Sequence, residues 1–315
     1  MTHPALAVRP LQPVDLPAYL AFYRAGPDGQ GVVGKTSGPP ALRDLLSSVE
    51  PHRQVLVARF DGRIIGLLSV GSGPGLDTWT VDRLLCLRDD AAEETRRALL
   101  RHLCGLAGDD GIQKIFLRTL IDSPLVESAA HVGFTRYATE DLYRLPSVPR
   151  LRTAAPPGLQ ARRGRDHQPL FRLYCAAVPA TVRQAEGMTL QEWRWAEGWG
   201  LRRSLVRTPL SAVQRRDYVL VHEDQAVAWL VVERARRRIM VMTHPDVAVP
   251  IGALVRFGLT RLSPGRDTYC AVRDYQGALG PTLEFLGFRL VTSHTLLVRT
   301  LTVRVREPKL VPVRA

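Results

Sequence analysis

A Gly-Phe pair that follows an apolar helical segment and precedes an extended segment occurs twice in this chain of 315 residues. The first pair is Gly133-Phe134. The second is Gly287-Phe288, roughly 150 residues further on, which is about one domain by the usual length prior. Solenoid repeats have much shorter periods, of about 20–50 residues. The spacing therefore predicts two copies of one fold in tandem.

Hydrophobic periodicity and turn residues predict the same order of elements in each half. In the first half we expect strands over 7–11, 54–60, 63–71, 79–87 and 114–120, helices over 13–24, 41–49, 91–106 and 124–132, and a closing pair of strands within 134–145. In the second half we expect strands over 159–162, 218–222, 226–232, 238–243 and 268–272, helices over 168–177, 190–198, 250–262 and 277–286, and closing strands within 288–305. Asp61-Gly62 and Glu223-Asp224 are expected to turn two hairpins.

A proline-rich stretch separates the two halves. It contains Pro146, Pro149, Pro156 and Pro157, and such a composition is typical of a linker. We therefore expect an α/β protein of two tandem domains, each with a mixed α+β sheet. The first domain covers 1–147, the linker covers 148–158, and the second domain covers 159–315.

This order of elements, with a Gly-Phe pair in each half, resembles the GCN5-related N-acetyltransferase (GNAT) family and its tandem members such as mycothiol synthase. The resemblance covers nearly the whole chain. It implies two acyl-CoA N-acyltransferase-like domains, each with a sheet whose two central strands splay apart. It also implies acetyl-CoA as the cofactor, with its thioester arm inserted in the splay.

In that family a glycine-rich turn leads into the helix after the fourth strand and holds the pyrophosphate of CoA on free backbone N–H groups. The matching segment of the first half, 91–96, contains no glycine. Glu93 and Glu94 place two negative charges there, and one like-charge contact at about 4 Å costs a few kcal/mol. The first half is therefore expected not to bind CoA in the usual way.

The second half keeps one glycine in the matching segment, and Pro250 fits the first position of a helix. The resemblance implies that the backbone of the strand before it holds the pantetheine arm. It also implies that the N–H groups at the helix start face the phosphates, with one arginine a turn further on. The expected cofactor-binding residues are Met240, Val241, Met242, Ile251, Gly252, Ala253 and Arg256.

The resemblance also indicates where catalytic groups are expected. The tyrosine that often serves as general acid, four residues before the Gly of Gly-Phe, is replaced by Ala129 and Leu283. A general base is usually a carboxylate within reach of the amine, directly or through water. The candidates are Asp82 in the first half and Glu233 or His244 in the second.

The asparagine that commonly lies eleven residues before the glycine is replaced by Asp122 in the first half and by Gln276 in the second. These departures weaken the expectation of catalysis without removing it, because thiolate is a tolerable leaving group and some family members work mainly by positioning.

The formal net charge is +13, which favours contact with phosphate backbones or acidic partners. All of the 43 basic residues except Lys35, Lys114 and Lys309 are arginines, and they are spread along the chain. The run Arg234–Arg238 is expected to be the tip of a hairpin. It is interpreted as a solvated turn, with contact to an acidic partner or to CoA phosphates as the alternative.

Two other segments have alternative interpretations. Gly29–Thr36 matches the phosphate-loop pattern, but a helix is expected before it and Ser37–Pro40 cannot continue as a helix, so nucleotide binding is disfavoured. It is interpreted as a flexible connection, or as a mobile substrate loop. The cluster of Trp193, Trp195 and Trp199 either stacks on bases, walls an acyl pocket or packs between domains.

Cysteine usage and hydropathy indicate the compartment. Cys86, Cys104, Cys175 and Cys270 are scattered, which favours reduced thiols over a disulfide or zinc framework. No apolar run approaches the length of a membrane span, and the first residues lack the blocks of a signal peptide. We expect a cytoplasmic protein with no metal and no membrane contact.

Two function classes remain open. The first is an N-acetyltransferase that transfers an acetyl or other small acyl group from CoA to an amine on a small molecule or peptide, with the activity centred on the second domain. The second is a pseudoenzyme, a binding protein with the same fold that contacts a nucleic acid or an acidic protein through its basic surface.

Overall fold

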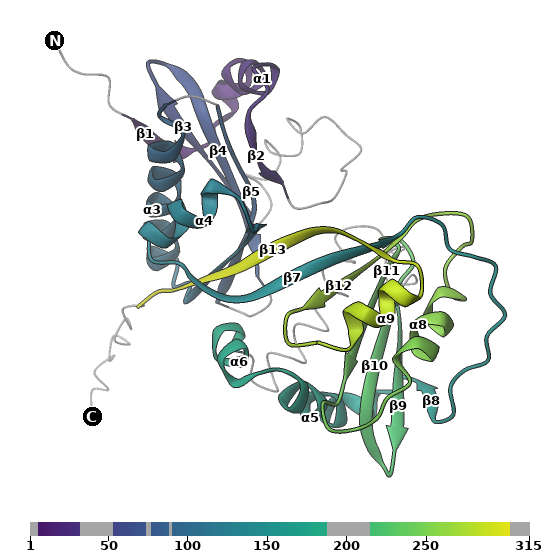
Figure 1. Ribbon diagram of the computed structural model, residues 1–315. Helices are drawn as coiled ribbons and strands as arrows, with labels where there is room; N and C mark the ends of the chain where they lie inside the picture. The colour runs from purple at the N-terminus through teal and green to yellow at the C-terminus, as the bar shows by residue number, and fades with distance from the viewer. Residues whose placement is uncertain (1–5, 32–52, 74–76, 88–89, 188–214, 303–315) are drawn as a thin grey trace, which may run out of the picture. The chain divides into compact units, whose positions relative to one another are not determined.

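The computed structural model describes residues 6–31, 53–73, 77–87, 90–187 and 215–302 (Figure 1). The chain divides into two compact units. Unit 1 combines Met1–Thr135 with Leu297–Ala315, and unit 2 is Arg136–Leu296. The expected helices over 41–49 and 190–198, the three tryptophans and Lys35 lie outside the described residues.

Unit 1 contains a mixed sheet in the order β1-β3-β4-β5-β6, with β2 paired to β5 and the end of β13 beside β6. Its strands are β1 (Ala7–Pro10), β2 (Asp28–Gly31), β3 (Gln54–Phe60), β4 (Arg63–Ser72), β5 (Thr78–Cys86) and β6 (Lys114–Leu120). Its helices are the 3₁₀ turn η1 (Pro13–Asp15), α1 (Leu16–Arg24), α3 (Ala92–Asp109) and α4 (Pro124–His131). Leu99, Leu100 and Leu103 of α3 are fully buried, as the apolar stripe predicts.

Unit 2 repeats this arrangement in the order β7-β12-β11-β10-β9-β8, with the first part of β13 beside β7. Its strands are β7 (Thr135–Leu145), β8 (Leu159–Ala161), β9 (Arg215–His222), β10 (Gln225–Glu233), β11 (Arg238–Thr243), β12 (Thr268–Arg273) and β13 (Arg289–Thr300). Its helices are η2 (Gly164–Asp166), α5 (His167–Ala177), α6 (Ala180–Glu186), α8 (Ile251–Leu259) and α9 (Leu279–Phe285). Helices α8 and α9 cover one face of the sheet, and α5 and α6 the other (Figure 1).

The α/β fold with a mixed sheet is therefore confirmed. Strand pairing joins the strands into one sheet through β13, where a separate sheet in each half was expected. Three local features support a duplication. Both expected hairpin turns have positive φ angles, at Asp61 and Gly62 and at Glu223 and Asp224. An extra residue bulges from β4 at Ile65 and from β10 at Val227. In each half the first strand, β1 or β8, is also followed by a 3₁₀ turn that ends on a buried aspartate, Asp15 or Asp166.

The final strands of the two halves are exchanged. β7 follows the first half in sequence but pairs with β12 in unit 2, from Thr268 opposite Leu145 to Arg273 opposite Glu140. The last residues of β13 belong to unit 1, where Leu301 N–H donates to the Gln113 carbonyl at 2.8 Å. The compact units therefore differ in composition from the halves read along the sequence, whose boundaries at 147 and 159 remain a prediction.

The expectation of two closing strands in each half is wrong. Thr135–Leu145 and Arg289–Thr300 are each one uninterrupted strand. Neither segment contains a glycine or proline, so nothing turns the chain back on itself, and each long strand reaches the neighbouring strand of the other half instead.

Three further expectations need correction. Asp28–Gly31 is a strand paired to β5, so the start of the Gly29–Thr36 segment is not a flexible connection. Helix α6 was missed, although Gly187 caps it in the left-handed conformation that commonly ends a helix. The tip at Arg234–Arg237 is not merely solvated, because Arg234 and Arg237 donate side-chain hydrogen bonds to backbone carbonyls of Arg261, Ser263 and Asp267.

The Gly-Phe glycines end α4 and α9 with φ angles of +86° at Gly133 and +87° at Gly287. This conformation is strained for any residue with a Cβ atom. A Cβ atom on Gly133 would also overlap Nη1 of Arg299, which donates to the Gly133 carbonyl at 3.0 Å. A Cβ atom on Gly287 would meet only Cδ1 of Leu145, at an ordinary 3.7 Å. Each glycine thus lies against the final strand that came from the other half.

Gly133→Ala is expected to destabilise unit 1 by about 2–3 kcal/mol, because backbone strain and the displaced Arg299 guanidinium add. Gly287→Ala is the matched control and is expected to cost about 1–2 kcal/mol, from backbone strain alone. Chemical denaturation of the full chain measures both. Equal losses in the two variants would show that Arg299 contributes nothing at Gly133.

Candidate functional site

The two central parallel strands of each unit are paired only where they begin. In unit 1, Thr78–Thr80 of β5 pairs with Lys114–Phe116 of β6. In unit 2, only Arg238 and Ile239 of β11 pair with Tyr269 and Cys270 of β12. Beyond these residues the strands of each pair separate, as the expected splay requires. In open α/β sheets ligands bind beyond the carboxyl ends of such strands.

In unit 2 a side-chain amide bridges the separated strands. Gln276 Nε2 donates to the Val241 carbonyl of β11 at 2.7 Å, and its Oε1 accepts from the Arg273 N–H of β12 at 3.0 Å. Gln276 is the residue that replaces the family's asparagine. The Val241 carbonyl, in the middle of the segment Met240–Met242, is therefore already bonded to the Gln276 side chain.

The start of α8 offers fewer free donors than expected. Ile251 N–H donates to the Val249 carbonyl at 2.8 Å, and Ala253 N–H donates to the Pro250 carbonyl at 3.0 Å. Within the described part of the chain, only Gly252 of the three expected donors keeps its N–H free of a backbone partner. Around Gly252 the nearest atoms to an added Cβ are Arg256 Nη2 and Thr282 Cγ2, both at 3.7 Å. The described residues thus leave one free N–H at the helix start, that of Gly252, with Arg256 beside it.

The start of α3 in unit 1 carries the two acidic residues expected from the sequence. Glu93 and Glu94 lie in its first turn, and no side chain caps the helix. Glu93 forms an ion pair with Arg97, whose Nη2 lies 3.4 Å from His131 Nδ1. This helix start is occupied by the chain's own ion pair.

The three predicted general bases lie in different places. Asp82 is in unit 1, at a bulge of β5 where the pairing with β4 shifts by one residue. His244 follows the carboxyl end of β11, and its Nδ1 accepts from the Asp246 N–H at 3.2 Å. Glu233 is opposite Arg238, the first residue of β11, and thus at the other end of the sheet from His244. Unit 2 therefore does not bring Glu233 and His244 together.

A group of ionisable side chains that sequence reasoning missed lies at the carboxyl ends of β11 and β12, on the face that α5 and α6 cover. We call it the tyrosine–glutamate cluster. Its members are Tyr137 and Glu140 of β7, Tyr174 of α5, Glu186 of α6, Arg273 of β12 and Tyr275 of the following turn.

Arg273 and Glu140 form a partly buried ion pair in this cluster. Arg273 Nε lies 3.0 Å from Glu140 Oε2, and the two residues are directly opposite on β12 and β7. Burial alone would lower the pKa of Arg273, but the charge of Glu140, followed by Tyr137 and Tyr275, outweighs it and raises the pKa. Arg273 therefore stays charged.

The tyrosines of the cluster stay neutral. Tyr174 donates a hydrogen bond of 2.7 Å to Glu186 Oε2, and burial, followed by the charge of Glu186, raises the pKa of Tyr174. Burial also raises the pKa of Tyr275, although Arg273 opposes it. These hydroxyl groups therefore remain hydrogen-bond donors at neutral pH.

Met242 connects the predicted cofactor strand with this cluster. It packs against a buried group that includes Tyr174, beside Tyr137 and Tyr275. Met242 also packs, with Phe171 and Trp229, against the buried group that includes Leu170 and Leu173. The end of the segment expected to hold pantetheine thus borders the tyrosines and carboxylates.

The signals for this cluster in the sequence were weak. Arg273 and Tyr275 directly follow a predicted parallel strand, where binding residues commonly lie. Tyr137 and Glu140 could not be assigned to the second half, because they belong to the exchanged strand β7.

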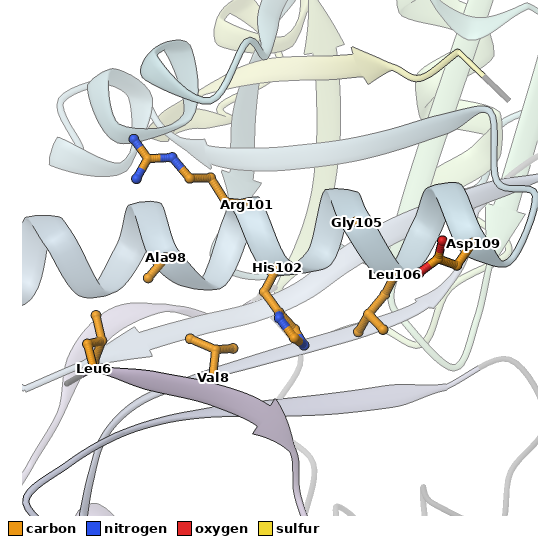
Figure 2. A pocket seen from close by; sticks show the side chains of 8 residues that line it. All are labelled: Leu6, Val8, Ala98, Arg101, His102, Gly105, Leu106 and Asp109. Atoms are coloured by element: carbon orange, nitrogen blue, oxygen red, sulfur yellow. The ribbon is translucent and has the colours of Figure 1, made fainter.

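A surface groove lies in unit 1, between α3 and β1 (Figure 2). It has a volume of about 560 Å³ and is lined by Leu6, Val8, Ala98, Arg101, His102, Gly105, Leu106 and Asp109. Figure 2 shows the His102 ring pointing toward β1 and the Arg101 side chain pointing away from it. None of the predicted site residues lines this groove.

The described residues contain neither a metal-binding cluster nor a membrane-spanning helix. No group of three or more His, Cys, Asp or Glu side chains there could hold a metal ion. Among the same residues, no helix combines the length and the apolar composition needed to span a bilayer.

Solved structures match the chain over nearly its whole length. A GCN5-related N-acetyltransferase from Sphaerobacter thermophilus is 14% identical with a TM-score of 0.57, and the match covers 95% of this chain and 97% of that one. A tandem GNAT protein from the clavulanic acid biosynthesis pathway is 17% identical with a TM-score of 0.52, covering 94% and 98%. The chain has a tandem GNAT fold. No protein-family model and no curated protein matches the sequence.

Proposed function

We propose that the protein is an acyl-CoA-dependent N-acyltransferase whose chemistry takes place in unit 2. The observation that carries the proposal is the position of the tyrosine–glutamate cluster. It lies at the carboxyl ends of the separated strands β11 and β12, against Met242 of the predicted cofactor segment. The tandem GNAT fold supports the same reaction class.

Acetyl-CoA is the proposed acyl donor, and its phosphates would lie toward the start of α8. The free N–H of Gly252 and the charge of Arg256 suit an anion there. Met240, Val241 and Met242 would hold the pantetheine arm. When bound, acetyl-CoA supplies an acyl group activated as a thioester.

The cluster suits a cationic amine as the acceptor. Glu140 and Glu186 carry two negative charges against the single positive charge of Arg273, so the local potential is negative. Glu140 is engaged by Arg273, which leaves Glu186 as the carboxylate to accept the ammonium proton. Tyr174 orients Glu186 by its hydrogen bond and, being neutral, does not compete for that proton.

Gly252→Glu is expected to weaken acetyl-CoA binding at least about tenfold, because a carboxylate at the helix start repels the phosphates and fills the open space. Isothermal titration calorimetry with acetyl-CoA measures the change. The full chain is used, because each isolated half would carry a final strand that belongs to the other unit.

Gly105→Glu, on an open part of α3, is the matched control and is expected to leave the affinity unchanged. If the wild-type chain does not bind acetyl-CoA, the proposal fails. The alternative, a GNAT-fold binding protein that contacts an acidic partner or a nucleic acid, would then account better for the degenerate helix start in unit 1.

A further inference from the structure

A group of arginines covers the end of unit 2 opposite the tyrosine–glutamate cluster. Here β7 ends and β11 and β12 begin, since Leu145 lies opposite Thr268 and Arg238 opposite Tyr269 (Figure 1). We call this group the arginine surface. It consists of Arg144, Arg234, Arg236, Arg237, Arg261 and Arg266.

Hydrogen bonds join the segments that carry these arginines. Arg234 Nε donates to the Arg261 carbonyl at 2.8 Å, and Arg237 Nη2 donates to the Ser263 carbonyl at 3.0 Å. Arg237 Nε also donates to the Asp267 carbonyl. Backbone carbonyls carry no net charge, so these bonds hold the guanidinium groups in place without neutralising them.

The acidic residues on this surface are few. Arg144 Nε lies 3.4 Å from Asp267, and Arg236 Nη1 lies 3.6 Å from Glu233. Burial, followed by the charge of Arg266, lowers the pKa of Arg237, while Asp267 opposes this. Arg266 thus lies close enough to Arg237 for their charges to repel, and a bound anion would relieve that repulsion.

The arginines are also accessible. The side chain of Arg236 is 69% exposed and that of Arg144 is 46% exposed. Arg234, Arg261 and Arg266 are exposed as well. None of the large exposed apolar side chains of the described residues belongs to this surface. Protein interfaces usually need a buried apolar or aromatic centre, whereas a phosphate backbone is bound by guanidinium groups alone.

We infer that the arginine surface binds the phosphate backbone of a nucleic acid. Guanidinium groups match phosphate oxygens in pairs, and several of them fixed side by side suit a chain of regularly spaced phosphates. The contacts involve no base edges, so binding is expected to be independent of sequence and to weaken with salt. This surface is separate from the proposed acyl-transfer site, and the inference does not depend on that function.

The test is fluorescence anisotropy of the full chain with labelled duplexes of about 20 base pairs, one of DNA and one of RNA. Arg236→Glu/Arg266→Glu is expected to weaken binding of the duplexes at least about tenfold. It is also expected to reduce the slope of log K against log salt by roughly 2, because two phosphate contacts are lost. Neither substituted side chain donates one of the bonds that join the segments, so the variant is expected to unfold at the wild-type temperature.

Arg172→Glu/Arg289→Glu makes the same change of net charge at exposed positions of α5 and β13. It is expected to weaken binding less than about threefold. Tighter binding of one duplex identifies that nucleic acid as the ligand, and equal binding supports backbone recognition. The inference is overturned if the wild-type chain binds neither duplex at low salt, if both double variants lose affinity equally, or if polyglutamate binds at least as tightly as the duplexes.

Discussion

Glu186→Gln is expected to lower kcat/KM for acyl transfer at least about 100-fold, since general base catalysis commonly contributes 10²–10⁴-fold. Glutamine can still accept the hydrogen bond from Tyr174, so α6 should stay in place, but it cannot take a proton from the amine. The rate of CoA release with a panel of primary amines and polyamines measures the effect. The affinity for acetyl-CoA is expected to be unchanged.

Glu284→Gln provides the matched control. Glu284 also accepts a tyrosine hydrogen bond, from Tyr143 at 3.3 Å, but it belongs to α9 on the other face of the sheet. Its substitution is expected to leave the rate within about twofold of wild type. Equal rates for the Glu186 and Glu284 variants would remove Glu186 from the reaction. The absence of activity with every amine would remove the enzyme proposal itself.

Asp15→Ala is expected to destabilise unit 1 by about 3–5 kcal/mol, the usual cost of breaking a buried ion pair. The Asp15 carboxylate is 1% exposed and accepts hydrogen bonds from Arg9 Nη1 and Nη2 at 2.7 and 2.6 Å, and from Arg59 Nη1 at 2.9 Å. Without it, both guanidinium groups lose their carboxylate partner and keep uncharged carbonyl partners, at Pro10 for Arg9 and at Gly62 for Arg59. Hydrogen exchange in β1 and β3 of the full chain measures the loss.

Asp110→Ala is the control, because Asp110 is exposed and bonds only the Gln54 amide among the described residues, at 3.1 Å. It is expected to cost less than about 1 kcal/mol. If Asp15→Ala also lowers the free energy of unfolding by less than about 1 kcal/mol, the ion pairs of Asp15 do not stabilise unit 1 as expected.

Asp15 is also expected to make the stability of unit 1 depend on pH. Burial alone would raise the pKa of Asp15, but the hydrogen bonds from Arg9 and the Gln12 N–H, with the charges of Arg9 and Arg59, outweigh it and lower the pKa. A carboxyl whose folded pKa is lowered stabilises the fold above its unfolded pKa of about 4, and this contribution disappears as pH falls through the folded value. The melting temperature of wild type is therefore expected to fall below about pH 4 more steeply than that of Asp15→Asn.

The architecture could be predicted from sequence because local signals repeat. The Gly-Phe pairs mark two helix ends, and the turns at Asp61-Gly62 and Glu223-Asp224 set two hairpins. Each of these signals acts within a few residues, so periodicity and turn chemistry were sufficient.

Most of the candidate site could not be predicted, because its residues come together only through long-range pairing. Glu140 meets Arg273 because β7 pairs with a strand that follows it by more than a hundred residues. No local pattern encodes that pairing. Glu233, one of the expected bases, is the last residue of β10, and in an antiparallel hairpin the end of one strand lies beside the start of the next. It is therefore far along the sheet from the carboxyl end of β11.

The exchange of β7 and β13 also constrains the order in which a ribosome can produce the folded protein. Unit 2 is continuous from Arg136 to Leu296, so it can close as soon as that stretch has emerged. Unit 1 includes residues from Leu297 onward and must wait for them, although most of it is synthesised first. Nascent domains generally fold from the N-terminus onward. Here the leading segment stays incomplete until the trailing one is made, and during that interval the outer edge of β6 is exposed to mispairing and to chaperones.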